Sequence, residues 1–462
     1  FAASACCAPP ESVLHPDFRK PMEKRLVEVA DMLAARDVRR DQQAALQKKY
    51  ASPLICFTLN IAGPEKRDAL IDRAFADGAQ RIEDQLRLSG VSVLDVQKKV
   101  AFTGDECIWA VRGDAKQIKR WMCAIEDDGE IGRLYDIDVI DADGKKLSRG
   151  EMRRCMVCGG DAFACARSRA HSWQELSACA HRIFDVYFDR KYAARVGMLA
   201  QRALLFEASV TPKPGLLDNE NNGSHKDMNR FTLIDSACVL RPFFDACARA
   251  GIDHRGDVRA AFEHIRDLGV RAEADMLSIC KTNAHKGALF SLGILCCAAV
   301  MAGEGADTDV ILRLAGEIAA PCMDRFAELT ADCAVTGGER QYLERGLYGA
   351  RGEAAAGFPT VRDVALPALR KAASRGMDAN AAAVHALLAL IAHVQDSNIL
   401  RRGGEGALRA AQRDAQNLLD MDYTMDDVRS MNDRFVQMNI SPGGSADLLA
   451  AAMLIDWLKV DG

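Results

Sequence analysis

Residues 207–228 form a polar loop between two stretches of apolar helical periodicity. Pro212, Pro214 and Gly215 break any helix and stiffen the backbone, so we expect Lys213 to project from a rigid turn. Cationic side chains suit a triphosphate, whereas carboxylates and amides suit Mg²⁺ or sugar hydroxyls. The alternative is a solvated turn whose side chains cap neighbouring helices. The loop offers Lys213, His225 and Lys226 as cations, and Asp218, Asp227, Asn221 and Asn222 as oxygen donors.

Four further stretches repeat this mixture of glycine and polar residues within an otherwise helical region. The last of them runs directly into a helical pattern, so backbone N–H groups at that helix start can face an anion. The alternative there is an ordinary serine N-cap. The candidate residues are Asn283, His285 and Lys286 in 282–287; Arg351 and Glu353 in 349–359; Asp396, Asn398, Arg401, Gly403 and Gly404 in 396–406; and Ser441, Gly443, Gly444, Ser445 and Asp447 in 439–447.

Asp136 and Asp138 lie two residues apart in an apolar strand pattern. Side chains alternate along a strand, so both carboxylates project to the same face and can chelate Mg²⁺ between them. An Asp-x-Asp pair at a strand end that simply faces water is the alternative. Because Leu134, Ile137 and Val139 make the rest of this strand apolar, the charged face favours the metal site.

The spacing Cys155-x₂-Cys158-x₆-Cys165-x₅-His171 brings four soft ligands into a short segment. Three cysteines and one histidine fit tetrahedral zinc, although the intervals are shorter than in common zinc fingers. The alternative is a set of free thiols packed near a turn. The sequence therefore indicates a zinc site as one of two interpretations.

The elements that must position Asp136 and Asp138 alternate between strand and helix. The apolar patterns predict the order β-α-β-β-α-β, the split βαβ arrangement, in which the edges and one face of the sheet can carry a site. An amphipathic helix precedes it, and the hairpin turn is expected near Gly104. The predicted elements are a helix in 22–50, a strand at 53–60, a helix at 66–88, strands at 91–102 and 107–111, a helix at 115–125 and a strand at 134–141.

The polar stretches of the second half lie between helices, and no alternating strand pattern occurs among them. We therefore expect an all-α domain whose inter-helix loops meet at one end. A helical pattern at 172–206 joins the two halves, with the domain boundary near residue 190. Helices are predicted at 231–249, 258–276, 287–302, 310–329, 364–373, 379–392, 405–419, 425–437 and 446–458.

Length and composition agree with a multidomain chain: an α+β domain at 22–189, an all-α domain at 190–462, and a tail at 1–21 to which we assign no role. A chain of 462 residues predicts two to three domains. The net charge of −5 with interspersed signs argues against nucleic-acid binding. Sixteen cysteines, mostly inside apolar helical runs, indicate buried reduced thiols in a cytoplasmic protein. No uninterrupted apolar run of about 18 residues predicts a membrane span.

With these five Gly-rich stretches in order, residues 195–460 resemble the triphosphoribosyl-dephospho-coenzyme-A synthase family. Residues 32–176 resemble the citrate lyase holo-acyl-carrier-protein synthase family, a phosphoribosyl-dephospho-coenzyme-A transferase. Between Arg149 and Arg153 the chain is shorter than that family's pattern. The stretches that carry the second resemblance are Ala34–Asp37, the Gly63-Pro64-x-Lys66 turn, 132–139, 147–149 and 153–171.

The first resemblance implies that the all-α domain joins ATP to 3′-dephospho-coenzyme A with release of adenine. Its candidate phosphate holders are the cations of the polar loops, with Asn222, Asn283, Asn398, the glycines and the serines beside them. Its carboxylates available for metal or proton transfer are Asp218, Asp227, Glu353, Asp396 and Asp447.

The second resemblance implies a nucleotidyltransferase that passes the product to a serine of the citrate lyase acyl carrier protein, releasing diphosphate. Asp136 and Asp138 would hold Mg²⁺, and Arg133 and Arg154 would steady the diphosphate. The equivalent pathway for malonate decarboxylase, and a nucleotide-binding module without turnover, are the alternatives.

Overall fold

The computed structural model describes residues 25–150, 152–327, 329–333 and 337–460, so the tail at 1–21 lies outside the described residues. By its internal contacts the chain divides into two compact units, Phe1–Phe188 and Asp189–Gly462. One continuous helix, α5 (Trp173–Ser209), runs from the first unit into the second.

The first unit is built on a four-stranded sheet whose elements follow in the predicted order. The strand order is β2-β3-β1-β4 and every neighbouring pair is antiparallel, so β3 lies between the two strands that α2 connects. The strands are β1 (Leu54–Leu59), β2 (Ser92–Lys99), β3 (Glu106–Arg112) and β4 (Tyr135–Ile140), and the connecting helices are α2 (Ala69–Leu88) and α3 (Ala115–Asp127).

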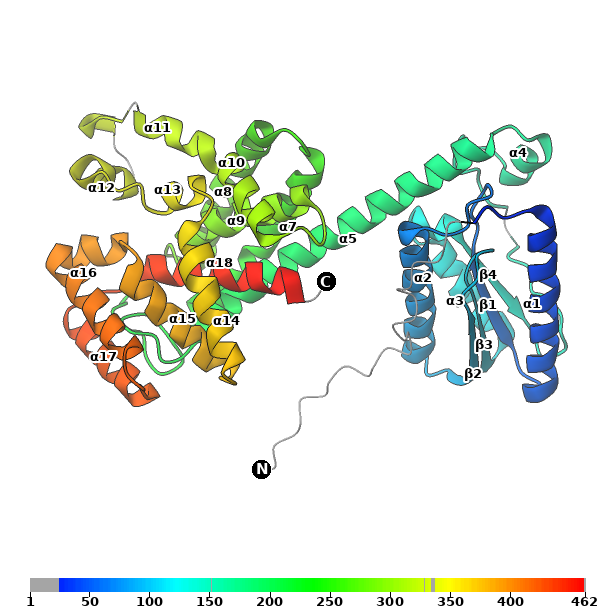
Figure 1. Ribbon diagram of the computed structural model, residues 1–462, viewed down its shortest axis with the longest axis horizontal. Coiled ribbons are helices and arrows are strands. Elements are labelled where there is room, and N and C mark those ends of the chain that lie inside the picture. The colour runs from blue at the N-terminus through cyan, green and yellow to red at the C-terminus, as the bar shows by residue number, and fades with distance from the viewer. Residues whose placement is uncertain (1–24, 151, 328, 334–336, 461–462) are drawn as a thin grey trace. The chain divides into compact units, whose positions relative to one another are not determined.

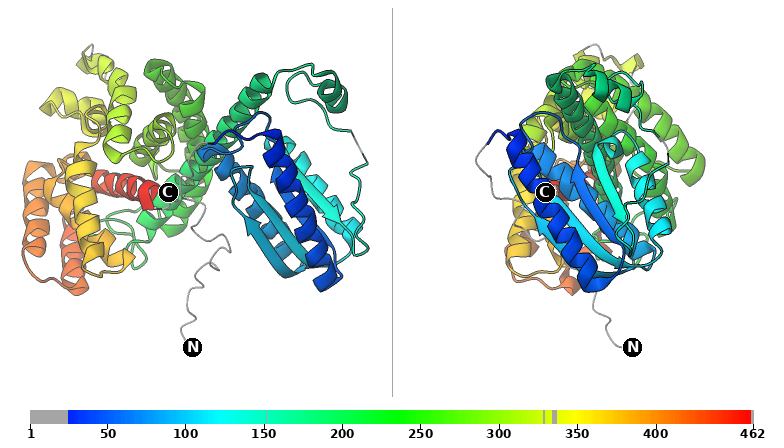
Figure 2. Two further views of the ribbon diagram at one scale, coloured as in Figure 1. Left: turned by 45° about the vertical axis from the view of Figure 1, so that its right-hand side comes forward. Right: turned by 90° about the vertical axis from the view of Figure 1, so that its right-hand side faces the viewer.

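Helices cover both faces of this sheet, as Figures 1 and 2 show. On one face α2 and α3 bury the larger apolar core, which includes Phe57, Phe75 and Trp109. On the other face lies α1 (Val29–Tyr50), whose Leu46 packs in a smaller cluster with Leu54, Cys56, Ile108 and Ala110. A short 3₁₀ turn, η2 (Ile131–Leu134), leads into β4, and α4 (Ala162–Ser168) precedes α5. Burial on both sides explains why β1 and β3 are apolar almost throughout.

The described part of the second unit contains helices and no strands. The predicted helix at 231–249 is wrong in one respect, because the structure divides it into two helices at Leu240. Pro242 stands in the first turn of the second helix, where its missing N–H costs nothing. Pro321 likewise begins a 3₁₀ turn that divides the predicted helix at 310–329.

Each remaining predicted helix overlaps an observed one. The helical elements of this unit after α5 are α6 (Arg230–Val239), α7 (Arg241–Asp253), α8 (Val258–Cys280), α9 (Lys286–Ala302), α10 (Thr308–Ala319), η3 (Ala320–Met323), α11 (Asp324–Ala327), η4 (Ala331–Cys333), α12 (Gly337–Arg345), α13 (Gly349–Ala355), η5 (Val361–Ala365), α14 (Leu366–Ser374), α15 (Ala379–His393), α16 (Ser397–Leu419, kinked at Gly404), α17 (Met425–Gln437) and α18 (Gly443–Val460).

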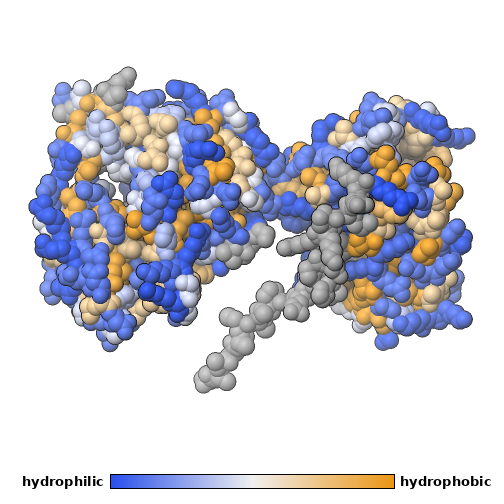
Figure 3. All heavy atoms as spheres, in the orientation of Figure 1, coloured by the Kyte–Doolittle hydropathy of each residue, from blue (hydrophilic) through white to orange (hydrophobic). Residues whose placement is uncertain are grey.

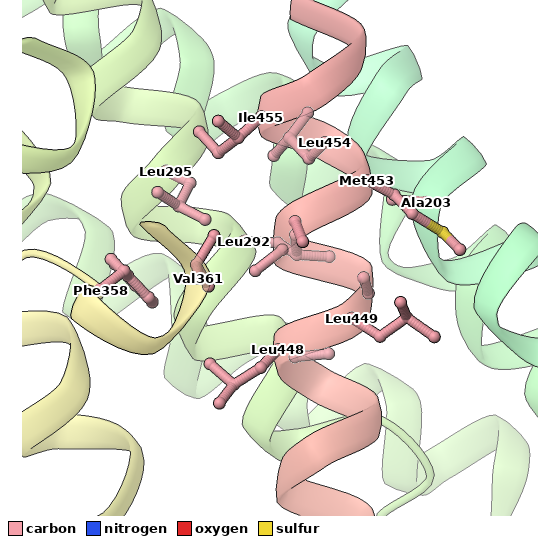
Figure 4. Packing of buried hydrophobic residues seen from close by; sticks show 14 of the residues in the cluster. Ala203, Leu292, Leu295, Phe358, Val361, Leu448, Leu449, Met453, Leu454 and Ile455 are labelled. Atoms are coloured by element: carbon pink, nitrogen blue, oxygen red, sulfur yellow. The ribbon is translucent and has the colours of Figure 1, made fainter. Parts of the chain in front are cut away.

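Two helices, α9 and α18, form the centre of the second unit. Both are apolar on nearly every side, which is the pattern of a helix enclosed by others. Figure 4 shows Ile455 of α18 on the side of Leu295 of α9, and Met453 on the opposite side, toward Ala203 of α5. Phe358, from the segment between α13 and η5, lies on the same side as Leu295. The amino-terminal ends of these two central helices therefore have fixed positions, and both carry residues of the predicted site.

Hydrophilic residues dominate the visible surface of each unit, with smaller apolar areas between them (Figure 3). Within the described residues no single helix combines the length and apolar character needed to cross a membrane; the bent pair α15 and α16 meets that test of length and composition only when taken together.

Candidate functional site

Lys213 does not project outward from its turn, so that part of the prediction is wrong. Its side chain is buried and its Nζ donates to Glu207 Oε1 at 2.6 Å and to the Glu207 carbonyl at 2.8 Å. Glu207, in the last turn of α5, is also buried. The two prolines do fix the backbone, but they direct the ammonium group inward, where a carboxylate offsets the cost of burying the charge.

Asp218 holds the polar loop closed. Its buried carboxylate accepts hydrogen bonds from the backbone N–H groups of Lys213, Glu220 and Asn221, at 2.8 to 2.9 Å. These bonds occupy the oxygens that the sequence analysis offered to a metal or to proton transfer. In this structure Asp218 therefore positions the loop around Lys213.

The loop docks on the segment that precedes α18. His225 Nε2 lies 2.9 Å from Ser441 Oγ, and Ser224 Oγ donates to the Ile440 carbonyl at 2.8 Å. Gly215 has φ +70°, and a Cβ there would lie 2.4 Å from the Ile440 carbonyl oxygen. Only glycine allows so close an approach of the two backbones. Arg402 adds a hydrogen bond from Nη1 to the Ser224 carbonyl at 2.9 Å.

The starts of α16 and α18 meet through Asp396. This buried carboxylate caps α16 by accepting from the N–H of Asn398 at 2.9 Å, and it also accepts from Ser445 N at 2.9 Å and Ser445 Oγ at 3.1 Å. Gly444 leaves room for it, since a Cβ there would lie 3.1 Å from Asp396 Oδ2. Burial raises the pKa of Asp396, and these hydrogen bonds oppose that rise.

Asp447, one turn into α18, faces the start of α9. A Cβ on Gly287 would lie only 2.0 Å from Asp447 Oδ2, so glycine is required at that contact. Burial, followed by the charges of Glu207 and Asp396, raises the pKa of Asp447 well above its usual range, although a backbone hydrogen bond from Ala288 opposes the rise. Asp447 therefore keeps its proton to a higher pH than an ordinary aspartate does.

Two histidines face the same buried lysine. His285 is buried, with Nδ1 2.8 Å from Ser236 Oγ, and burial followed by the charge of Lys213 lowers its pKa to about 3. Burial and then the charge of Arg402 lower the pKa of His225, with a smaller contribution from Lys213. His285 Nε2 and His225 Nδ1 are buried without a hydrogen-bond partner. Both imidazoles are neutral near pH 7, and each has a free ring nitrogen.

These contacts join four of the five Gly-rich stretches, those at 207–228, 282–287, 396–406 and 439–447. The fifth, at 349–359, is tied to other residues. Arg351 pairs with Glu339 of α12 at 3.5 Å, and Glu353 accepts from Thr360 N at 2.7 Å and Thr360 Oγ1 at 2.9 Å. Burial raises the pKa of Glu353. Its link to the other four is indirect, because Gln341 of α12 donates to the Ser397 carbonyl beside Asp396 at 2.7 Å.

The other predicted ligands lie at the rim of this cluster or are engaged elsewhere. Asp227 accepts from Thr282 Oγ1 at 2.8 Å, a bond that lowers its pKa. Lys286 pairs with Glu273 of α8, so it is less free than expected. A Cβ on Gly443 would lie 2.7 Å from Asn398 Nδ2. Exposed positions are occupied by Asn222, Lys226, Asn283, Arg401 and Gly403.

In the first unit Asp136 and Asp138 share one face of β4, as predicted. In the register with β1 they oppose Thr58 and Cys56, and Cys56 packs under α1, so the pair lies on the face that α1 covers. Asp138 pairs with Lys146 at 2.5 Å. Loss of surrounding water, followed by the charge of Asp138, raises the pKa of Asp136. Two carboxylates that repel each other in this way fit a divalent cation.

Cationic groups surround this pair, but not those that the sequence singled out. Arg39 of α1 is paired with Glu106 at 2.6 Å, and the charge of Asp136 is one of the causes that raise the pKa of Arg39. The charge of Arg153 lowers the pKa of Asp136. Arg133 instead hydrogen-bonds the carbonyl of Arg154, whose own side chain is exposed. Arg39 and Arg153 are therefore the guanidinium groups whose charges interact with Asp136 at the candidate metal site.

The four predicted zinc ligands do come together. One donor atom from each of Cys155, Cys158, Cys165 and His171 lies within 4.8 Å of the others.

Two surface hollows lie away from these clusters. One of about 680 Å³ is lined by residues of α10 and by 355–357, and one of about 640 Å³ is lined by α3 and 147–149. The second is basic, with Lys116, Lys119, Arg120 and Arg149 in its wall.

Several residues of the clusters were missed by sequence reasoning. Glu207 begins the stretch predicted to be a polar loop, whereas the structure places it in the last turn of α5. Ser236 lies in a helical pattern that gives no sign of a polar partner, and Arg402 was passed over for its neighbour Arg401. Asn432 lies in the middle of α17, and its spacing in the sequence does not indicate a functional contact. Its Oδ1 nevertheless accepts a hydrogen bond from Gly215 N at 2.9 Å. A buried-face position occupied by a carboxylate or amide, as at Glu207 and Asn432, is the signal that could have found them.

The fold and these clusters define a chain of two units: a helical unit with a buried polar cluster and a sheet unit that carries paired carboxylates. Residues 193–462 match the family described as "ATP:dephospho-CoA triphosphoribosyl transferase", and residues 27–187 match "Apo-citrate lyase phosphoribosyl-dephospho-CoA transferase". The chain belongs to the first family, and on the same polypeptide it carries a domain of the second. Both resemblances predicted from the sequence are thereby confirmed.

Two relatives match over most of the length of both chains, and a third matches over most of its own length. "Protein CitXG" of Haemophilus influenzae is 32% identical over 91% of this chain and 94% of that protein. "Protein CitXG" of Leuconostoc mesenteroides subsp. cremoris is 30% identical over 92% of this chain and 96% of that protein. A "2-(5''-triphosphoribosyl)-3'-dephosphocoenzyme-A synthase" of Pectobacterium atrosepticum is 39% identical over 61% of this chain and 95% of that protein.

Proposed function

We propose that this chain is a bifunctional transferase that makes the prosthetic group of citrate lyase and attaches it to the acyl carrier protein. The observation that carries the proposal is that one polypeptide contains two family domains whose reactions are consecutive. The helical unit makes 2′-(5″-triphosphoribosyl)-3′-dephospho-coenzyme A, and the split βαβ unit consumes it. Relatives that match along the whole chain support this combination.

In the helical unit, the ribose 2′-hydroxyl of 3′-dephospho-coenzyme A attacks the anomeric carbon of the ATP ribose. The new C–O bond replaces the bond to adenine, which leaves with a proton, and the triphosphate stays intact. The transition state resembles an oxocarbenium ion, so the site needs a base for the hydroxyl and an acid for the purine.

The cluster around Lys213 offers both groups. His225 is neutral, is positioned by Ser441 and keeps Nδ1 free, so we assign it the role of base. Asp447 faces the start of α9 beside Gly287, and burial raises its pKa, which favours the protonated carboxyl, so we assign it the role of acid. The exposed Lys226 and Arg401 at the rim, and the start of α18, are the groups we assign to the triphosphate.

In the sheet unit, a serine hydroxyl of the carrier protein attacks the phosphorus nearest the added ribose. Diphosphate leaves, and a phosphodiester joins the cofactor to the protein. Asp136 and Asp138 would hold Mg²⁺, which when bound lowers the charge cost of the attacking and leaving oxygens. The charges of Arg39 and Arg153 interact with Asp136 and would balance the diphosphate charge. Arg133, in η2, hydrogen-bonds the carbonyl of Arg154, the residue after Arg153.

A two-product assay tests the proposal. The purified chain is incubated with ATP, Mg²⁺ and 3′-dephospho-coenzyme A, and free adenine is measured; the apo carrier protein of citrate lyase is then added and diphosphate is measured. We expect adenine before the carrier protein is added and diphosphate only after it. Diphosphate release with the malonate decarboxylase carrier protein alone would assign the chain to that pathway. ATP binding without adenine release would make it a binding module.

A further inference from the structure

The four ligand atoms of Cys155, Cys158, Cys165 and His171 are arranged as around a metal ion. All four lie within 4.8 Å of one another, and Cys158 Sγ and Cys165 Sγ are 3.5 Å apart. A disulfide would require about 2 Å between the sulfurs. Thiolates on one tetrahedral zinc ion stand about 3.8 Å apart, since each Zn–S bond is about 2.3 Å. The sulfur separation therefore fits a shared metal and excludes a disulfide.

The backbone between the first two cysteines folds into a tight turn directed at one point. Cys155 N donates to the Gly160 carbonyl at 2.7 Å, and Gly159 N donates to the Cys155 carbonyl at 2.9 Å. The backbone N–H groups of Val157 and Cys158 also point at the Cys155 sulfur. Such N–H groups around a sulfur are the outer contacts that orient a metal thiolate.

The second pair of ligands is brought back by a short helix. Asp161 caps α4 by accepting from the N–H groups of Phe163 and Ala164, which places Cys165 on the side facing the turn. Arg169 then ends the helix in a left-handed conformation, with φ +53°. The chain reverses there and returns His171 to the three cysteines.

Little apolar packing holds this segment in place. No residue of α4 is buried, and Phe163 and Met152 are 70% and 79% exposed. His171 Nε2, by contrast, is buried and has no hydrogen-bond partner. A buried polar atom without a partner is costly unless something else binds it. An ordered loop with an exposed apolar surface and an inward-facing cluster of soft ligands is the structure of a metal knuckle.

We propose that Cys155, Cys158, Cys165 and His171 bind one structural Zn²⁺. Four protein ligands leave no open position, so the ion has a structural role and takes no substrate. It fixes residues 152–172 beside β4, where Arg153 Nη1 donates to the Tyr135 carbonyl at 3.0 Å and Cys179 Sγ donates to the Met156 carbonyl at 3.3 Å. The inference does not rest on the proposed function, because it concerns the metal alone.

The test is the zinc content of the full chain, expressed with added zinc and purified without chelators. We expect about one zinc per chain in the wild-type protein, released by an organomercurial that attacks thiolates and detected with a chromogenic chelator. Cys165→Ser should lose the zinc. Cys238→Ser is the matched control, because Cys238 is an exposed free thiol outside the cluster and its loss should leave the zinc bound.

Three results would overturn the proposal: wild-type protein without stoichiometric zinc, zinc retained in Cys165→Ser, or a Cys158–Cys165 disulfide found by mass spectrometry under non-reducing conditions. If Cys165→Ser fails to fold, the mercurial titration of the wild-type protein still decides. If the zinc is released after the mercurial has reacted with fewer than three thiols, that result would also contradict the ligand set of three cysteines and one histidine.

Discussion

Lys213 Nζ and Glu207 Oε1 form a buried ion pair at 2.6 Å, with only 1% and 7% of the two side chains exposed. The charge of Lys213 acts on both His225 and His285, and the charge of Glu207 acts on Asp447. The pair therefore contributes to the pKa shifts of three residues of the helical cluster, after burial, which is the largest cause of each shift. Because each ion is desolvated, neither can be removed without leaving the other uncompensated.

Lys213→Met should unfold more easily and should stop adenine release. It leaves the Glu207 carboxylate buried and unpaired, which costs about 3–5 kcal/mol. Adding Glu207→Gln should recover part of that loss, so the double variant is more stable than the sum of the two single changes. Urea unfolding and an adenine assay measure both effects. Lys371→Met is the control, since Lys371 is exposed on α14 outside the cluster, and its stability should change by no more than about 0.5 kcal/mol. Wild-type stability and turnover in Lys213→Met would contradict the central role of the pair.

Asp136→Asn together with Asp138→Asn should abolish diphosphate release while adenine release continues. The change removes the two carboxylates that share one face of β4 and leaves the helical unit untouched. Both products are measured in the presence of the apo carrier protein. The matched control is Asp143→Asn, an exposed carboxylate in the turn after the same strand. Loss of both activities in a folded double variant would mean that the two reactions do not have separate sites.

Much of the first unit could be predicted because its signals are local. Apolar alternation and turn residues gave the order of strands and helices, and the spacing of Asp136 and Asp138 placed both on one face. The helix that packs against that face could not be predicted. Which helix covers a sheet face depends on tertiary packing, and α1 brings Arg39 to the carboxylates only through contacts far apart in the sequence.

In the second unit the polar loops were found because glycine and proline mark them, but the direction of their side chains was not. Pro212 and Pro214 predicted a rigid turn and gave no information on which way Lys213 points. Its partner Glu207 stands in the apolar pattern of α5, where nothing distinguishes a buried carboxylate from a solvated one. The meeting of four loops is likewise a property of helix packing, which single-sequence periodicity does not specify.

Stability should fall in acid because of His285. Its pKa is about 3 in the folded chain, below the value of about 6.5 expected when unfolded, so the unfolded chain binds the proton first. Stability from this group is complete above about pH 6.5 and is lost as the pH falls from there toward 3. The loss should reach about 2 kcal/mol between pH 7 and pH 5. His285→Asn should flatten the pH dependence of urea unfolding by that amount. His264→Asn, the same change at an exposed position, should not flatten it; an unchanged slope in His285→Asn would refute the assignment.

Adenine release should depend on a proton donated by Asp447. Burial and then the charges of Glu207 and Asp396 raise its pKa, so the carboxyl keeps its proton to a higher pH than an ordinary aspartate and ionises as the pH rises further. If Asp447 protonates the departing purine, the rate of adenine release should decline on the alkaline side. Asp447→Asn should lower kcat by about 10²–10⁴-fold, with a smaller effect on KM for ATP, and should abolish that alkaline decline.

The control for Asp447→Asn is Asp433→Asn, which neutralises an exposed carboxylate on α17. It should keep both the rate and the pH profile, because its charge lies outside the buried cluster. Asparagine keeps the shape of the side chain beside Gly287 but cannot donate a carboxylic proton, so packing and proton transfer are separated. A folded Asp447→Asn variant that releases adenine at the wild-type rate, with the same alkaline decline, would place the acid elsewhere. His285, which has a free ring nitrogen but a pKa near 3, could not replace it as a proton donor at neutral pH.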